Sequence, residues 1–132
     1  MSVADEILAL ERAALDRWGK GDPTGCLEIC APDVTYFDPA VPKRIDGLEA
    51  LTEYYDPIAG KVSIDRFEYL HTHVKVNGDM AVLTYNLVSH ARAGATAEAG
   101  KTRWNVTEVY ERLGKQWKIV HSHFSRTESG TP

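Results

Sequence analysis

The hydrophobic pattern of this chain changes its period at Lys61. Before that residue, apolar side chains recur at the spacing of amphipathic helices; after it, they alternate with polar ones as in β-strands. Helices that come first and an antiparallel meander that comes last indicate an α+β fold with the helices on one face of a curved sheet. A chain of 132 residues can bury one core of this kind, so we expect a single domain over residues 1–132.

The part of the chain before this change carries the signals of three helices and one short strand. Ser2 and Asp5 form a capping box ahead of a long apolar stripe. Asp22-Pro23 begins a second, shorter helix that Pro32 ends. The expected elements are helices over 2–19, 23–31 and 48–58 and a β-branched, aromatic strand over 34–38.

The part of the chain after the change of period is expected to form strands. An Asn-Gly-Asp sequence at 77–79 is typical of a tight hairpin turn, and a Leu-Gly-Lys sequence at 113–115 separates a second pair of strands. A longer loop rich in alanine and glycine, residues 92–100, joins the two hairpins. The four expected strands run over about 62–76, 80–91, 101–113 and 116–126.

Charge and composition argue against several classes of partner. The formal charge is −4 and no basic run is longer than Lys43-Arg44, so we expect no nucleic-acid partner. No apolar run approaches the roughly 20 residues that cross a bilayer, and the N-terminus is acidic where a signal peptide is basic. These features favour a cytoplasmic protein without membrane contact. No Gly-rich nucleotide motif or P-loop is present, so we expect no cofactor.

Two stretches of the chain resemble a known superfamily. Residues 101–125, KTRWNVTEVYERLGKQWKIVHSHFS, end in a strand similar to the last strand of the calcium/calmodulin-dependent kinase II association domain and its free-standing relatives. Residues 33–39, followed by Gly47, resemble the first strand and following helix of ketosteroid isomerases. Both groups belong to the nuclear transport factor two-like superfamily, with scytalone dehydratase and the SnoaL-like polyketide cyclases. The resemblance implies a cone-shaped fold in which three N-terminal helices pack on a curved, mostly antiparallel sheet.

The resemblance also implies a pocket on the concave face of the sheet and a subunit interface on the convex face. Strand alternation then sorts the side chains by face. The side chains expected to face inward are Leu83, Tyr85, Leu87, Ser89, Trp104, Val106, Glu108, Tyr110, Val120, Ser122 and Phe124. The set expected to face outward on the last strand is Trp117, Ile119, His121 and His123. Because this outward set is too apolar for open solvent, we expect a homodimer through the convex sheet face.

Asp38 is the first candidate for chemistry, because it matches in register the general-base aspartate of the ketosteroid isomerases. Walls formed by Tyr36, Tyr54 and Tyr85 would partly desolvate this carboxylate. Such a group suits proton transfer at a carbon next to a carbonyl. The other interpretation is that Asp38 caps the turn at Pro39.

Glu108 is the second candidate. An unpaired carboxylate between Val106 and Tyr110 on a buried strand face would cost several kcal/mol, so Glu108 must be protonated, paired with an arginine or functional. The resemblance places Glu108, Leu87 and Phe124 where the kinase association domain has three pocket arginines. We therefore expect a pocket that prefers a neutral or cationic small molecule, unless Arg103 or Arg126 reaches in from the rim.

Histidine and cysteine pairs do not predict a metal site. Cys26 and Cys30 have no further ligand close by in sequence and are expected to pack as small apolar side chains. Two His-x-His pairs, at 71–73 and 121–123, would lie three strand positions apart in the superfamily's sheet, roughly 14 Å at about 4.8 Å per strand. One subunit cannot bring these two pairs to one ion, although a dimer could.

Three functions remain open from the sequence: a cofactor-free isomerase, dehydratase or cyclase acting on an apolar oxygenated substrate, a ligand-binding domain, and an oligomerisation module. The isomerase pattern is incomplete, because Ala14 and Thr107 stand where the resemblance implies the oxyanion-hole tyrosine and aspartic acid. For an enzyme we expect Asp38, Glu108 and Tyr85 as catalytic residues. The expected pocket residues are Trp18, Tyr36, Tyr54, Leu87, Trp104, Tyr110, Ser122 and Phe124.

Overall fold

Helices come first and strands last in the computed structural model, which describes residues 1–91 and 100–127. The helices are α1 (Val3–Gly19), α2 (Thr24–Glu28), α3 (Leu48–Tyr55) and a short 3₁₀ helix, η1 (Asp56–Ile58). The strands are β1 (Cys30–Phe37), β2 (Ile45–Asp46), β3 (Ile64–Asn77), β4 (Met80–Ala91), β5 (Lys101–Leu113) and β6 (Gln116–Arg126). Most of the expected loop at 92–100 lies outside the described residues.

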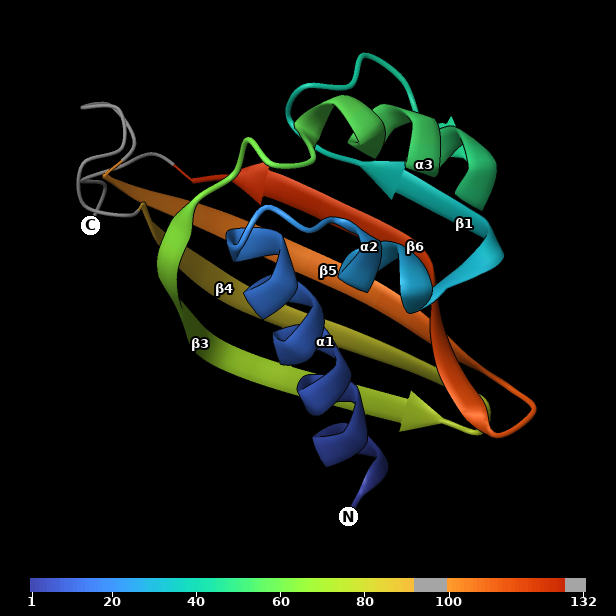
Figure 1. Cartoon of the computed structure of the whole chain (residues 1–132). Helices are drawn as coiled ribbons and strands as arrows, with labels where there is room; N and C mark the ends of the chain where they lie inside the picture. The colour runs from blue at the N-terminus through green and yellow to red at the C-terminus, as the bar shows by residue number, and fades with distance from the viewer. Residues whose placement is uncertain (92–99, 128–132) are drawn as a thin grey trace.

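The described strands form one six-stranded sheet in the order β2-β1-β6-β5-β4-β3. Only the β1–β6 pair is parallel, and the other neighbours are antiparallel. Figure 1 shows α1 lying across one face of β3, β4 and β5, with α3 next to β1. This arrangement confirms the predicted α+β fold of helices packed on a curved, mostly antiparallel sheet.

The start of α1 follows the local sequence closely. The Ser2 side chain accepts the Asp5 backbone N–H at 3.1 Å, and the Asp5 carboxylate accepts the Ser2 N–H, so the expected capping box is present. The face that α1 turns to the sheet contains Ile7, Glu11 and Leu15, all buried. One acidic residue is thus part of an otherwise apolar face.

The second helix is shorter than predicted, and the following strand begins earlier. The expected helix over 23–31 ends at Glu28, and Cys30 already pairs with Ile119 of β6. Register is lost between Cys30 and Thr35, around Pro32. Because proline has no N–H to donate, it interrupts the ladder without ending the strand.

A β-bulge interrupts the alternation of β6. Val109 of β5 is opposite His121, but the next residue, Tyr110, is opposite Ile119. Val120 is therefore an extra residue on β6. As a result, the side chains on one side of Val120 lie on the face opposite to the one that regular alternation along the strand would give them.

The bulge corrects the predicted facing of the last strand. Trp117 and Ile119 are 5% and 3% exposed and belong to the core, so their placement on the convex face was wrong. Val120 was expected to line the pocket and does not. His121 and His123 lie on the convex face, where both rings contact Phe37. A regular two-residue alternation could not predict the facing of this strand, because one extra residue inverts the alternation of all residues beyond it.

Candidate functional site

A cavity of about 260 Å³ lies between the helices and the sheet. Its wall is largely apolar, and the aromatic part consists of Trp18, Tyr36, Tyr55, Phe67, Trp104 and Phe124. Three carboxyl groups also line it, from Glu11, Asp38 and Glu108, against one guanidinium, that of Arg126. The volume is slightly below the roughly 300 Å³ at which pockets for drug-sized ligands begin, so the cavity suits a small molecule.

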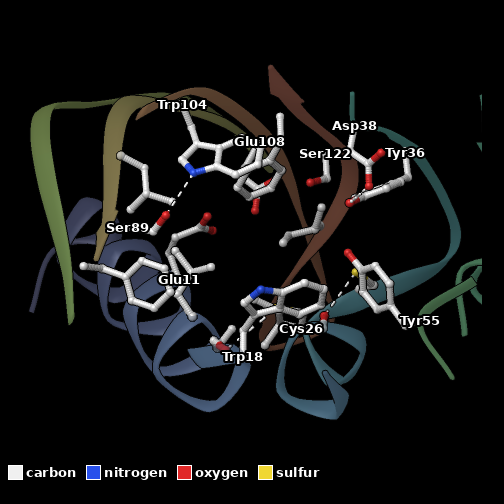
Figure 2. A pocket seen from close by; sticks show the side chains of 18 of the residues that line it. Glu11, Trp18, Cys26, Tyr36, Asp38, Tyr55, Ser89, Trp104, Glu108 and Ser122 are labelled. Atoms are coloured by element: carbon white, nitrogen blue, oxygen red, sulfur yellow. Dashed lines mark hydrogen bonds between the residues drawn. The ribbon is translucent and has the colours of Figure 1, made fainter. Parts of the chain in front are cut away.

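Glu11 and Glu108 form a buried carboxyl pair in this cavity. Each residue is 3% exposed. In Figure 2, Glu11 reaches from α1 and Glu108 from β5 into the same hollow. The Tyr85 hydroxyl donates to Glu11 Oε2 and the Tyr110 hydroxyl donates to Glu11 Oε1, each at 2.6 Å. Both carboxylate oxygens of Glu11 therefore accept a hydrogen bond from a phenol.

Glu108 is held in its neutral form. Burial raises the pKa of Glu108 well above the usual range, and the nearby charge of Glu11 and a hydrogen bond to Glu11 raise that pKa further. Ser122, directly opposite on β6, gives the carboxyl a hydrogen bond that acts in the other direction. The pair thus carries one proton and one negative charge.

The phenols behind the pair remain protonated. Burial, followed by the charge of Glu11, raises the pKa of Tyr85 and the pKa of Tyr110 well above the ordinary range of a phenol. Neither residue lines the cavity, since Glu11 separates both from it. Tyr85 and Tyr110 were expected to face the ligand. In the structure they instead donate hydrogen bonds to the Glu11 carboxylate, which lines the cavity.

Asp38 lies on another side of the cavity at the end of β1. Its Oδ2 accepts the hydroxyls of Tyr36 and Tyr54, each at 2.8 Å, and its Oδ1 accepts the Ala40 N–H at 2.8 Å. Burial and then Asp38 itself raise the pKa of Tyr54 to about 12, so this phenol stays a donor. Asp38 therefore both fixes the turn after β1 and presents a carboxylate to the cavity.

The cavity brings together most of the residues predicted from sequence. The predicted residues that line it are Asp38, Glu108, Trp18, Tyr36, Leu87, Trp104, Ser122 and Phe124. Tyr54 contributes only through its hydrogen bond to Asp38. Sequence reasoning missed Glu11. Its signal was its position, one turn after Ile7 and one turn before Leu15 on the apolar stripe of the first helix.

An arginine partner for Glu108 was the structural alternative, and the described residues do not supply one. No ion pair there includes Glu108 or Glu11. Arg126 instead lies over the Trp104 ring at 5.3 Å. Trp104 in turn donates its Nε1–H to the Ser89 hydroxyl at 3.2 Å. The negative charge of the carboxyl pair is consequently held by hydrogen bonds alone.

The two cysteines and His121 take packing positions. Cys26 and Cys30 are free thiols, and burial raises the pKa of Cys30 to about 12. His121 shares a 2.7 Å hydrogen bond with Thr35, and burial lowers the pKa of His121. Over residues 1–91 and 100–127, no three His, Cys, Asp or Glu side chains gather as a metal site would require. The helices described are too short or too polar to span a membrane.

The neutral state of Glu108 predicts a pH dependence of stability. A carboxyl whose pKa is raised by folding keeps a proton that the unfolded chain releases above about pH 4.3, so stability falls as pH rises from there towards the raised pKa. Glu108→Gln removes this titration. Between pH 5 and 7, the wild type should lose up to about 1.4 kcal/mol per pH unit relative to Glu108→Gln, measured by urea denaturation. Parallel curves for the two proteins would show that Glu108 is ionised when folded.

Comparison with known proteins identifies relatives of this architecture. A family model described as a SnoaL-like domain matches residues 7–128. A crystal structure from Parabacteroides distasonis ATCC 8503, provisionally named a ketosteroid isomerase, is 35% identical with a TM-score of 0.84, covering 97% of this chain and 90% of that one. A protein of unknown function from Pseudomonas putida KT2440, named NTF2-like, is 23% identical with a TM-score of 0.82, over 100% and 99% of the two chains.

Kinase association domains form a second group of similar structures. The hub homology domain of the Chlamydomonas reinhardtii kinase is 26% identical with a TM-score of 0.76, covering 97% of this chain and 100% of that domain. The calcium/calmodulin-dependent protein kinase type II alpha chain of Drosophila melanogaster is 24% identical over 122 residues. This match covers 91% of the chain but only 23% of the kinase.

Proposed function

The chain belongs to the SnoaL-like domain family, and we propose that it is a cofactor-free enzyme that moves protons on a small, largely apolar, oxygenated substrate. The reaction class is that of an isomerase, dehydratase or cyclase. The similarity to a structure provisionally named a ketosteroid isomerase supports this class. The family alone does not decide it, because the same fold also occurs in kinase hub domains.

The observation that carries the proposal is one cavity lined by two carboxyl groups, Asp38 and Glu108, in different surroundings. Asp38 accepts three hydrogen bonds, from the Tyr36 and Tyr54 hydroxyls and the Ala40 N–H. Glu108 is buried beside a negative charge, and its raised pKa keeps it neutral. Two titratable groups whose environments differ in this way are the usual basis of acid/base catalysis at neutral pH.

The proposed chemistry divides between these two groups. Asp38 takes a proton from carbon at a free lone pair of its carboxylate, and the C–H electron pair moves onto a neighbouring substrate oxygen. Glu108 stabilises that oxygen by hydrogen bonding or by giving it a proton, in place of the oxyanion donors for which the sequence has Ala14 and Thr107. When Glu108 gives up its proton, the new negative charge lies on Glu108 itself, where the hydrogen bond from Ser122 favours it, while the two phenol donors hold the charge that Glu11 already carries.

Hydrogen–deuterium exchange tests this function even while the product is unidentified. Small carbonyl compounds that bind the cavity are incubated with the protein in D₂O, and mass spectrometry detects deuterium at carbon. The proposal predicts exchange at the carbon next to the carbonyl for at least one bound compound, above the rate in buffer. Compounds that bind without any exchange would favour a ligand-binding domain instead.

We also propose that two copies of the chain associate through the convex sheet face. The residues that form this interface differ in part from those predicted from the sequence. Trp117 and Ile119 cannot contribute, but Val82, Val109 and His121 lie in one row across β4, β5 and β6 on that face. Val82 is 37% exposed. An apolar row of this kind is typical of a contact between subunits, and the similarity to association domains supports the proposal.

A lysine in this row should separate the subunits. Val82→Lys is expected to halve the molar mass measured by light scattering, because a dimer would have to bury the new ammonium groups. Val76→Lys is the matched control, since Val76 is also exposed and pairs with buried Ala81 on the other face of the sheet. A wild-type protein that is monomeric, or a Val82→Lys protein of unchanged mass, would contradict this interface.

A further inference from the structure

The indole of Trp18 is a hydrogen-bond donor of the cavity that has no acceptor. Trp18 lines the cavity from the last turn of α1, and Figure 2 shows its nitrogen facing the hollow. Trp104 donates its Nε1–H to Ser89, whereas the Trp18 Nε1–H makes no hydrogen bond to the described part of the chain. Protein does not enclose this atom either. Over residues 1–91 and 100–127, the enclosed side-chain atoms without a partner belong to Tyr69 and Glu108. The Trp18 N–H is therefore accessible from the cavity.

The other aromatic donors around the cavity already have acceptors. The phenols that donate to a cavity carboxylate are Tyr36, Tyr54, Tyr85 and Tyr110. The Tyr55 hydroxyl shares a hydrogen bond with Tyr36. A donor with an acceptor inside the protein gains little from a ligand, because the new bond only replaces an old one. Trp18 differs from these groups in that a ligand can satisfy it.

Packing on two sides fixes the position of this donor. The Trp18 ring meets the ring of buried Tyr55 edge-on, with 5.0 Å between the centroids. The next residue, Gly19, brings the end of α1 close to β3, since a Cβ at this position would lie 3.1 Å from Ile64 O and from the Phe67 ring. A donor that is held in place before the ligand arrives loses little conformational freedom on binding.

Helical spacing provides room for a ligand beside the indole. Glu11, Ala14 and Trp18 follow each other at intervals of three and four residues, so they share one face of α1, and all three line the cavity. The small side chain of Ala14 leaves space between the carboxyl group and the indole. A ligand that fills this space displaces water from the Trp18 N–H. Leaving that N–H unpaired would cost roughly 1–3 kcal/mol, so the ligand must bring an acceptor.

The charges around the cavity favour an uncharged acceptor. The carboxyl groups that line it are those of Glu11, Asp38 and Glu108. The guanidinium of Arg126 also lines it, but lies over the Trp104 ring. A ligand carboxylate would lose its hydration among three carboxyl groups and gain an uncharged donor at Trp18. An ammonium group has no lone pair with which to accept the N–H. A carbonyl or ether oxygen accepts it without a charge to desolvate.

We propose that Trp18 determines the ligand specificity of this cavity, through a hydrogen bond from its Nε1–H to a carbonyl or ether oxygen of an uncharged ligand. The inference rests on the proposed function, because it names a group that the substrate of the same site carries. Figure 2 shows Trp18 across the hollow from Glu108 and Asp38. A ligand held by Trp18 on the helix side therefore extends towards these two carboxyl groups.

Two probes of the same shape test this hydrogen bond. Cyclohexanone and methylenecyclohexane differ in one oxygen that is replaced by a CH₂ group, and neither has an aromatic ring that would shift signals by itself. The chain has three tryptophans, and ¹H–¹⁵N NMR resolves their indole N–H signals. Cyclohexanone should move the Trp18 proton signal downfield, and methylenecyclohexane should not. An unmoved signal, or equal movement with both probes, would overturn the inference.

A charged probe of similar size tests the second part of the proposal. Cyclohexanecarboxylate at pH 7 should bind more weakly than cyclohexanone, because it must lose its hydration beside the cavity carboxyl groups. Dissociation constants come from the same NMR titrations. Tighter binding of the carboxylate would show that the ligand is an anion and would overturn the proposal.

A pair of tryptophan variants measures the contribution of the N–H group. Trp18→Phe keeps an aromatic ring next to Tyr55 but has no N–H, so it should weaken cyclohexanone binding about fivefold more than methylenecyclohexane binding. Trp104→Phe is the matched control, since Trp104 also lines the cavity but its N–H already binds Ser89. This control should affect both probes equally. Equal weakening of both probes in Trp18→Phe would mean that Trp18 contributes apolar surface alone.

The NMR titration of the wild type covers the case in which Trp18→Phe does not fold, because triple-resonance spectra then assign the indole signals. Failure of this inference is distinguishable from failure of the proposed function. Deuterium exchange into a bound ketone without a shift of the Trp18 signal refutes the Trp18 contact and leaves the catalysis standing. A shift of the Trp18 signal without exchange in any bound carbonyl compound refutes the catalysis and leaves the contact standing.

Discussion

Glu11→Leu is expected to lower the free energy of unfolding by about 3–6 kcal/mol. Three buried donors lose their acceptor in this variant: the hydroxyls of Tyr85 and Tyr110 and the acid group of Glu108. Each costs roughly 1–3 kcal/mol when left unpaired, and burial of the leucine side chain offsets part of the loss. Urea denaturation at pH 7 measures the change.

Glu11→Gln is the matched control for this large effect. Its amide keeps an acceptor oxygen for one of the two phenols, so its loss of stability should be clearly smaller than that of Glu11→Leu. A Glu11→Leu protein within about 1 kcal/mol of the wild type would mean that the phenols and Glu108 find other partners. In that case the carboxyl pair would not organise the interior of the cavity.

Asp38→Asn is expected to reduce turnover by about 10²–10⁴-fold, the usual contribution of a general base. The amide oxygen can still accept the Tyr36 and Tyr54 hydroxyls, whereas the NH₂ group cannot accept the Ala40 N–H, so the turn after β1 loses one hydrogen bond and should stay folded. It has no basicity with which to take a proton from carbon. The rate of deuterium exchange into a bound carbonyl compound measures the effect.

A second substitution on the same strand controls for Asp38→Asn. Asp33 is exposed at the other end of β1 and does not line the cavity, so Asp33→Asn should exchange deuterium at the wild-type rate. Circular dichroism establishes that both variants fold. An Asp38→Asn protein with wild-type exchange would exclude Asp38 as the base and leave the proposed chemistry without one.

Much of the fold could be predicted from local signals in the sequence. The change of period at Lys61, the capping box at Ser2 and the hairpin turn at 77–79 are properties of neighbouring residues, and each has its counterpart in the structure. The resemblance drawn from residues 101–125 is confirmed by the match to the SnoaL-like family. Local signals and family resemblance were therefore enough to predict the architecture.

The interior of the site required long-range information. The bulge at Val120 depends on how β6 pairs with β5, and a pattern within one strand does not contain it. Glu11 resembles an ordinary helix residue until α1 is packed on the sheet, which brings Tyr85 and Tyr110 to it from 74 and 99 residues away in the chain. Glu108 could be selected from sequence because a carboxyl group on a buried strand face is conspicuous by itself.

The protonation state of Glu108 is the central claim, and ¹³C NMR of glutamate-labelled protein tests it most directly. Comparison with Glu108→Gln assigns the carboxyl carbon signal, which is then followed from pH 4 to 9. We predict that Glu108 is still neutral at pH 7, because burial and the Glu11 charge raise its pKa. A signal that titrates near pH 4.3, as an exposed glutamate does, would contradict the account.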